Sequence, residues 1–229
     1  FTLLAVYATS MNFTILEISI VTFLLAVSGA IAQFPIGKIS DMYDRRKVIV
    51  FSTFGAAMFS IFAILVSRQM YLPGSLATSK TWFYIFFILF SFCSLPMFSL
   101  ILAHTNDYIS KDKFVAAGAG LQFAFGLGAM SGPFLCSIFM DLVGSNGFFV
   151  FLFFFHCIIG FFGIYRMKVR QSVDNPDSQF VAMPQTITPA GIELNPTTEH
   201  IEEPYSDKVK EILERKGVKY KKEEDEMKT

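Results

Sequence analysis

Long apolar runs alternate with short charged connectors along most of the chain. Five runs hold almost no charged side chain; they span residues 18–39, 48–67, 82–103, 114–140 and 148–165. An α-helix of about 20 apolar residues crosses the hydrocarbon core of a bilayer, where lipid offers no hydrogen bonds to an unpaired backbone. Each run is therefore predicted to be a transmembrane α-helix. Residues 1–9 have the same character and are expected to be the end of a sixth, truncated helix.

The basic residues of the connectors fall mainly on one side of the predicted membrane. Successive connectors alternate between the two sides, so that one side receives nine lysines and arginines and the other side only Arg68 and Lys80. Cytoplasmic loops carry the excess of basic residues in membrane proteins. This bias predicts that the connector at residues 37–47 and everything after residue 170 are cytoplasmic.

Composition divides the chain into an apolar body and a polar tail. Residues 1–170 contain eleven basic and six acidic side chains, a net charge of +5, whereas residues 171–229 contain eight basic and thirteen acidic ones, a net charge of −5. The tail also holds five prolines, and polar segments of this kind cannot bury enough apolar surface to fold. We predict a transmembrane helical bundle over residues 1–170 and an acidic, mostly disordered cytoplasmic tail over residues 171–229, with one short helix at 206–216.

Three of the complete predicted helices carry polar side chains at membrane depth, and two do not. Helices with polar or small residues face a cavity or another helix, whereas bland helices face lipid. The bland helices are those at 48–67 and 148–165, and each closes a group of three, which predicts two three-helix repeats of the kind found in many transporters. The polar residues that this pattern selects as candidates for lining a cavity are Thr22, Gln33, Ser91, Ser94 and Gln122.

The predicted helix at 114–140 contains the pair Gly128 and Gly132, followed directly by Pro133. Two glycines four residues apart let helix backbones approach closely. A proline inside a helix removes one backbone hydrogen bond and permits a bend. A tight packing seam and a hinge used in transport are both compatible with this pattern.

The densest cluster of charge lies in the stretch GKISDMYDRRK at residues 37–47. Gly37 allows the backbone to approach a neighbour closely where a helix ends. Asp41 can accept hydrogen bonds near a helix N-terminus, and Arg45 and Arg46 can pair with carboxylates or lipid phosphates through two hydrogen bonds at once. The stretch is either a conformational latch, with ion pairs that form in one state and break in another, or an anchor that fixes the topology through local charge pairing.

This stretch resembles the signature loop of the major facilitator superfamily, which joins the second and third helices of each half of that fold. The residues that match the pattern in register are Gly37, Ser40, Asp41, Arg45 and Arg46. Met42 and Asp44 depart from it, because they stand where a basic residue and a glycine are usual. The stretches FPIGKISDMYDRRKV, LAHTNDY, FVAAGAGLQFAFGLGAMSGP and FVAMPQTITPAGIELNP are similar to the YcaD-like branch of the family.

The resemblance implies an all-α integral membrane protein and places the chain in the C-terminal six-helix half of the fold, with its first helix truncated. It implies a secondary active transporter, not an enzyme, that moves a small solute across the cytoplasmic (inner) membrane of a bacterium by alternating access and needs no cofactor. The expected partners are the lipid bilayer, a small-molecule substrate, a coupling proton and the N-terminal half of the same polypeptide. The family's latch role extends by this resemblance to Gly37, Asp41, Asp44, Arg45 and Arg46.

His104 and Asp107 are the strongest remaining candidates for chemistry. The alternative is that this stretch forms charge pairs, either with Lys111 or Lys113 or with the stretch at residues 37–47. One histidine and one aspartate are too few ligands for a metal centre, so no metal site is predicted. Gly37 and Lys38 lack the flanking residues of a phosphate-binding loop, and the basic residues anchor helix ends and do not form a nucleic-acid surface. Two alternatives to a transporter stay open: a lipid-handling membrane enzyme that uses His104 and Asp107, and a membrane scaffold or binding protein that acts through its tail.

Overall fold

Helices are the only regular secondary structure in the described part of the chain. The computed structural model describes residues 3–69, 76–110, 113–170 and 180–183, all within one compact unit, Phe1–Thr197. Its helices are α1 (Leu4–Ser10), α2 (Ile15–Met42), α3 (Arg45–Gln69), α4 (Leu76–Ser94), α5 (Met97–Asn106), α6 (Phe114–Val143) and α7 (Gly147–Val169). The predicted all-α fold is therefore confirmed. The short helix predicted at 206–216 lies outside the described residues.

Five stretches of the described chain are long and apolar enough to cross a membrane: Ile15–Met42, Arg45–Arg68, Ser79–Asn106, Phe114–Val143 and Gly147–Val169. Each contains one of the five predicted spans. The third stretch is not a single helix, because the helix is interrupted at Leu95 and Pro96, between α4 and α5. Proline has no N–H to continue the helical ladder. The Leu95 side chain packs at Gly29 of α2, where any larger residue would collide with it.

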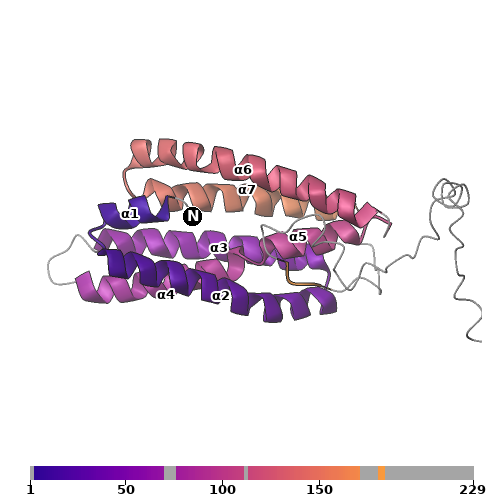
Figure 1. Ribbon diagram of the computed structural model, residues 1–229, viewed down its shortest axis with the longest axis horizontal. Coiled ribbons are helices and arrows are strands. Elements are labelled where there is room, and N and C mark those ends of the chain that lie inside the picture. Colours follow the sequence, from indigo (N-terminus) through magenta and orange to yellow (C-terminus); the bar gives the residue numbers. More distant parts are fainter. Residues whose placement is uncertain (1–2, 70–75, 111–112, 171–179, 184–229) are drawn as a thin grey trace, which may run out of the picture. The chain divides into compact units, whose positions relative to one another are not determined.

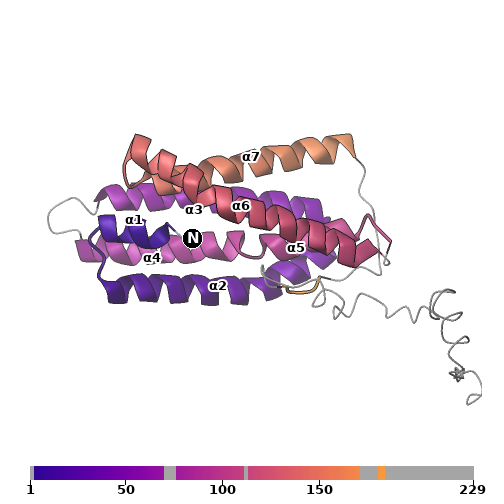
Figure 2. The same cartoon turned by 45° about the horizontal axis from the view of Figure 1, so that its top comes forward.

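Helix α3 lies at the centre of the arrangement. It packs most extensively against α7 on one side and α4 on the other, while α2 packs mainly against α4. Figure 1 and the turned view of Figure 2 both show α3 between α7 and α4. The sequence predicted a bland helix here that faces lipid, and for one face of α3 this was wrong.

The buried face of α3 is a stripe of small residues. Serine, threonine and alanine recur at spacings of three and four, which places them on one side of a helix; they are Thr53, Ala56, Ser60, Ala63 and Ser67, none more than 1% exposed. Their hydroxyl groups donate to carbonyl oxygens of α3 itself, as Ser60 does to Ala56 O at 2.9 Å. Because these hydroxyls are satisfied within the helix, the stripe accepts close packing from α4 and α7.

Aromatic side chains fill the core near α1. Tyr7 of this short helix is fully buried and stacks against Phe83 of α4 and Phe148 of α7, with its ring edge to Phe149. Phe83 continues the stack onto Phe87 with ring centroids 5.8 Å apart. Aromatic pairs at such separations add roughly 0.5–1.5 kcal/mol each beyond their area burial, so this cluster joins α1, α4 and α7 firmly.

Two reciprocal hydrogen bonds connect α2 and α4. The Ser28 hydroxyl donates to Ile88 O at 2.8 Å, and the Ser91 hydroxyl donates to Leu25 O at 2.7 Å. Each bond runs from a side chain of one helix to the backbone of the other, in opposite directions. Hydrogen bonds of this kind between membrane helices contribute about 0.6 kcal/mol on average.

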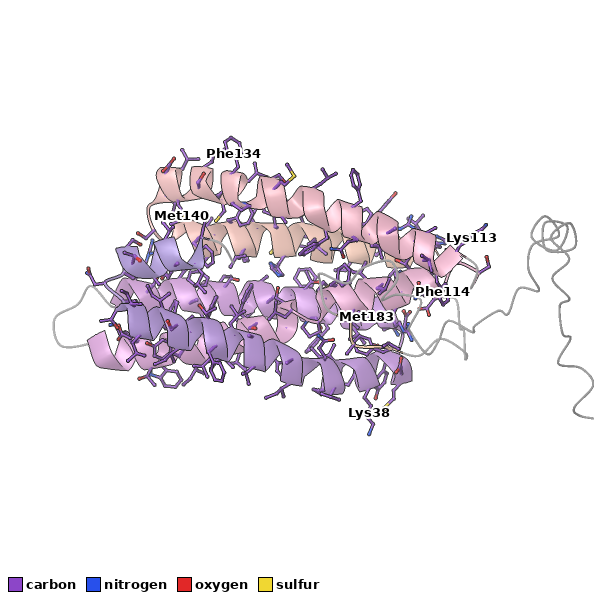
Figure 3. The ribbon with its side chains drawn as sticks, viewed as in Figure 1. Lys38, Lys113, Phe114, Phe134, Met140 and Met183 are labelled. Atoms are coloured by element: carbon purple, nitrogen blue, oxygen red, sulfur yellow. The ribbon has the colours of Figure 1, made fainter. Side chains whose placement is uncertain are left out.

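Helix α6 differs from the other spans because it is the least buried of the five. It packs mainly against α7 and presents a row of large apolar residues with nothing described against them: Phe123, Leu127, Met130 and Phe134. Figure 3 shows Phe134 projecting away from the other helices. Much of this helix is therefore open to lipid or to a further partner.

Candidate functional site

Arg45, the first residue of α3, holds two carboxylates from different helices. Its Nη2 lies 2.8 Å from Asp41 Oδ1 at the end of α2, and its Nη1 lies 3.2 Å from Asp107 Oδ1 just after α5. The side chain of Arg45 is only 7% exposed. We call Asp41, Arg45 and Asp107 the Arg45 cluster. One guanidinium thus fastens the connector between α2 and α3 to the end of α5.

Asp44 and Arg46 form a second, local pair beside the cluster. Arg46 Nη2 lies 2.7 Å from Asp44 Oδ2, and Arg46 Nε donates to Asp44 Oδ1 at 3.0 Å. Asp44 Oδ1 also accepts the backbone N–H of Arg46, so Asp44 caps the N-terminus of α3. The side-chain hydrogen bonds from Arg46 hold the pKa of the Asp44 carboxyl below its ordinary value. Asp44, which stands where the signature loop usually has glycine, therefore stabilises the start of α3 and holds the Arg46 side chain.

A segment of the predicted tail docks at the Arg45 cluster. The backbone N–H of Phe180 donates to Asp41 Oδ1 at 2.8 Å, the same oxygen that accepts from Arg45. The Phe180 ring lies directly over Gly37, where any side chain would collide with it. The glycine of the signature loop thus makes room for a residue far away in the sequence.

The same segment continues to a contact with α5. Met183 is 6% exposed; its N–H donates to the Ser99 hydroxyl at 3.1 Å, and that hydroxyl lies 3.0 Å from Met183 O. Ser99 also lies 3.1 Å from Gln33 Oε1 of α2. Residues 180–183, which the sequence assigned to a mostly disordered tail, therefore connect α2 to α5 at this end of the bundle.

Comparison with known proteins identifies the family. The family model for the Major Facilitator Superfamily matches residues 1–210 of the 229. The chain belongs to the major facilitator superfamily. Together with its five apolar spans, this makes it an integral membrane protein.

Curated relatives carry the family name as well. An uncharacterized MFS-type transporter from Yersinia enterocolitica is 28% identical over 160 residues, which cover 70% of this chain and 37% of that protein. An uncharacterized MFS-type transporter from Yersinia pestis is 25% identical over the same shares of the two chains. The chain thus spans little more than a third of the length of these relatives. No solved structure matches it.

Three of the superfamily member's five predicted cavity residues bond to neighbouring helices. Ser91 is buried and donates to α2, as described above. Ser94 Oγ lies 3.1 Å from His156 Nε2 of α7, and Gln33 meets Ser99 of α5. These contacts place all three between helices of the described bundle. That these three residues line a substrate cavity stays a prediction.

Thr22 and Gln122 lie apart from those three. Thr22 is exposed on α2, and its hydroxyl donates to Ile18 O of the same helix at 2.9 Å. Gln122 Oε1 on α6 is enclosed but has no hydrogen-bond partner within the described residues. An enclosed amide oxygen without a partner is costly. Gln122 is therefore the member of the set whose oxygen is left unpaired among the described residues.

Gly128, Gly132 and Pro133 line an apolar hollow of about 510 Å³ between α6 and α7. Nothing described lies within 4 Å of a side chain added at either glycine. Helix α6 runs without a break through Pro133. The described chain thus supplies no partner for a glycine seam here, and both the seam and the hinge stay predictions.

The structure also assigns surroundings to the proposed enzyme pair. Asp107 is bound to Arg45, and the His104 ring meets Tyr108 edge to face at 5.0 Å. Among the described residues no three His, Cys, Asp or Glu side chains gather as a metal site would require. Sequence reasoning missed the docked segment and the α3 stripe; a signal for the stripe existed, since Thr53, Ala56 and Ser60 recur at helical spacing.

Proposed function

We propose that this chain is the C-terminal part of a secondary active transporter that moves a small solute across a bacterial cytoplasmic membrane by alternating access. In this mechanism two halves rock about a central site, so that the site opens to one side of the membrane at a time. The Arg45 end of the bundle, where α3 begins and α7 ends, would face the cytoplasm. The remaining partners are the N-terminal half of the same polypeptide, the substrate and a coupling proton.

The observation that carries this proposal is the shared guanidinium of Arg45. Two carboxylates on different elements converge on one buried cation, and a backbone N–H of the 180–183 segment shares the oxygen of Asp41. Charge pairs at an interface that opens can be exchanged between states, because each state supplies different partners. In this proposal the cluster serves as a latch, whose contacts break when the cytoplasmic side rearranges.

The exposed face of α6 supports the same proposal. Phe123, Leu127, Met130 and Phe134 are exposed along it. Elsewhere on the helix, Gly128 and Gly132 have nothing described within 4 Å of an added Cβ atom, and small residues of this kind permit another helix to approach. In this proposal the N-terminal half packs against α6, and the transport pathway runs along that helix.

Accessibility of a cysteine tests the latch directly. The whole polypeptide that contains this chain is reconstituted in liposomes, with Cys93, Cys136 and Cys157 replaced by serine and Gln33→Cys as a probe. Arg45→Gln should raise labelling by a membrane-impermeant maleimide from the cytoplasmic side and change solute flux. Lys38→Gln is the matched control, because this exposed cation projects away from the helices (Figure 3).

Two results together would refute the proposal. One is the absence of flux for every solute class tested in the unmodified protein. The other is maleimide labelling at position 33 that is equal from the two sides of the membrane and equal in the Arg45→Gln and Lys38→Gln variants. Flux without a change of labelling would keep the transporter and remove the latch.

A further inference from the structure

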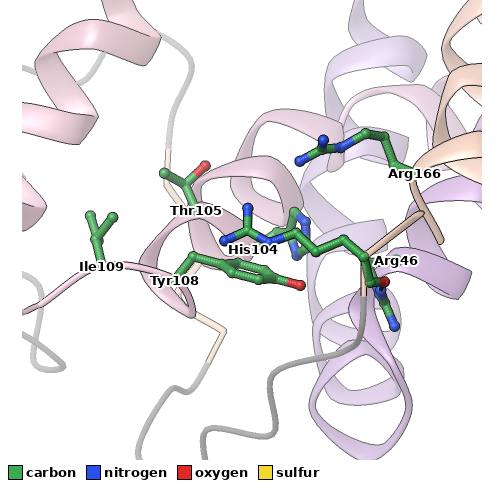
Figure 4. Close-up of a pocket in the computed structure, with 7 residues that line it drawn as sticks. Arg46, His104, Thr105, Tyr108, Ile109 and Arg166 are labelled. Atoms are coloured by element: carbon green, nitrogen blue, oxygen red, sulfur yellow. Dashed lines mark hydrogen bonds between the residues drawn. The ribbon is translucent and has the colours of Figure 1, made fainter. Parts of the chain in front are cut away.

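A pocket of about 220 Å³ lies at the Arg45 end of the bundle, separate from the Arg45 cluster. Three arginines line it: Arg46 of α3, and Arg166 and Arg170 at the end of α7. His104 and Thr105 of α5 and Tyr108, just after α5, line the other side. Figure 4 shows Arg46, Tyr108 and Arg166 around this hollow. Since a water molecule takes about 30 Å³ in the liquid, the pocket can hold a group of several heavy atoms.

The arginines are held in place by contacts that leave positive charge available. The Arg170 guanidinium lies 4.3 Å from the centre of the Tyr108 ring, a cation–π contact that orients it. Arg46 Nη1 donates to Arg170 O at 2.7 Å, which joins α3 to the end of α7.

Among the described residues, the charges around the pocket do not balance. Asp44 pairs with Arg46, but among the described residues Arg166 and Arg170 have no carboxylate within ion-pair distance. The three arginines and one aspartate therefore sum to +2. A concave site with this excess attracts an anion, and guanidinium groups match phosphate oxygens through paired hydrogen bonds.

The geometry points to a binding site for a phosphate group, carried by the headgroup of an anionic phospholipid. The pocket lies at the ends of membrane-spanning helices, which is the depth of lipid headgroups. The turns of α7 that lead into it expose Phe161, Phe162 and Tyr165 to the surroundings, so acyl chains can lie along the same helix whose arginines hold the phosphate. Basic pockets between membrane helices bind acidic headgroups in this way.

Binding by the purified whole polypeptide that contains this chain, in detergent, tests the site. Native mass spectrometry measures the dissociation constants of cardiolipin, phosphatidylcholine and inorganic phosphate. Cardiolipin should bind at least tenfold more tightly than phosphatidylcholine, and the double variant Arg166→Gln/Arg170→Gln should weaken cardiolipin binding by about tenfold or more. Arg166→Gln alone, which removes no described hydrogen bond, should give a smaller loss and keeps the test valid if the double variant misfolds.

Lys168→Gln is the matched control, since Lys168 is exposed on the same helix end but does not line the pocket. It should change cardiolipin binding by less than about twofold. Equal losses for Lys168→Gln and the arginine variants would overturn the site, because the general charge of the helix end would then bind the lipid. If inorganic phosphate binds with the same arginine dependence and cardiolipin has no greater affinity, the lipid assignment is overturned and a soluble anion is the ligand.

Discussion

The two ends of the helical bundle are fastened by different forces. At the Arg45 end, one buried cation joins two carboxylates, and the 180–183 segment adds hydrogen bonds from its backbone. At the opposite end, which we call the Lys80 end, Lys80 of α4 pairs with Glu17 of α2 at 2.7 Å. The remaining contacts there are mainly aromatic, around Tyr7.

The two kinds of contact differ in how easily they can be exchanged. Aromatic packing is short-ranged and cooperative, and it is lost only when the helices themselves separate. Ion pairs at helix ends can be exchanged one by one, because each needs only a partner of opposite charge. The contacts at the Arg45 end therefore fit the proposed latch better than those at the Lys80 end.

The largest expected effect comes from Arg45→Gln. Removing a nearly buried cation shared by two carboxylates leaves their negative charges close together. This should lower the free energy of unfolding by about 3 kcal/mol, the low end for a broken buried pair, since Asp41 is 35% exposed. Thermal unfolding in detergent measures the loss. Lys38→Gln, a neighbouring exposed cation, should change the free energy by less than about 0.5 kcal/mol. Equal effects of the two variants would mean that the cluster contributes no more than net charge.

A smaller effect is expected where the 180–183 segment meets Gly37. The methyl group of Gly37→Ala would collide with the Phe180 ring, so the ring and the N–H bonded to Asp41 must move. Gly126→Ala is the control, because nothing described lies within 4 Å of its added carbon. Gly37→Ala should be less stable than Gly126→Ala by about 1 kcal/mol, the low end for overpacking.

Hydrogen exchange locates that effect. A peptide covering residues 180–183 should exchange faster in Gly37→Ala than in Gly126→Ala. Unchanged exchange would show that the segment does not depend on its seat over Gly37.

Lys80→Met probes the opposite end. The substitution keeps an apolar side chain near the Phe13 ring, which Lys80 Nζ approaches at 4.7 Å from the centroid, and removes only the charge. We expect a loss of about 0.5–1 kcal/mol, since the pair is partly exposed. Arg68→Gln, the other cation that the sequence assigns to this side, should have no measurable effect. A loss as large as that of Arg45→Gln would contradict the contrast between the two ends.

The smallest effect is a pH dependence at Asp44. Folding lowers the pKa of this carboxyl because Arg46 donates hydrogen bonds to it, so its contribution is fully present above the ordinary aspartate value of about 3.9. The contribution is lost as the pH falls through the lower folded-state pKa. Asp44→Asn should therefore be less stable than the unmodified chain by under about 1 kcal/mol at pH 7. Denaturation between pH 7 and pH 3 should show this difference shrink with acidification, and a difference that grows would contradict the assignment.

Hydropathy was sufficient to predict the helices but not their neighbours. All five predicted spans exist, because the requirement to satisfy the backbone in lipid acts on each segment by itself. Burial depends on what packs alongside, and this is why α3 was predicted to be peripheral. Its Ser60 and Ser67 appear polar in sequence, yet each donates to a carbonyl of its own helix and so costs little to bury.

The candidate site was predicted in part. The pairing of Asp41 with Arg45 was predicted because both lie in one short charged connector. Helical spacing does not explain the contact, because α2 ends at Met42 and α3 begins at Arg45. The pairing of Asp107 with this connector was one of two alternatives that the sequence left open, and the ion pair with Arg45 confirms it. Phe180 was not predicted as a partner, since it lies 135 residues from Arg45. Only tertiary structure brings it there, and no local pattern marks a backbone N–H as a ligand for a carboxylate.

The crossed hydrogen bonds of Ser28 and Ser91 have a mechanical consequence for α2 and α4. Two hydrogen bonds on a shared face, donated in opposite directions, resist both translation and rotation of one helix against the other. We expect α2 and α4 to move as one rigid body during any rearrangement. The motion would then be taken up elsewhere, at the joint of Leu95 and Pro96 where α4 gives way to α5.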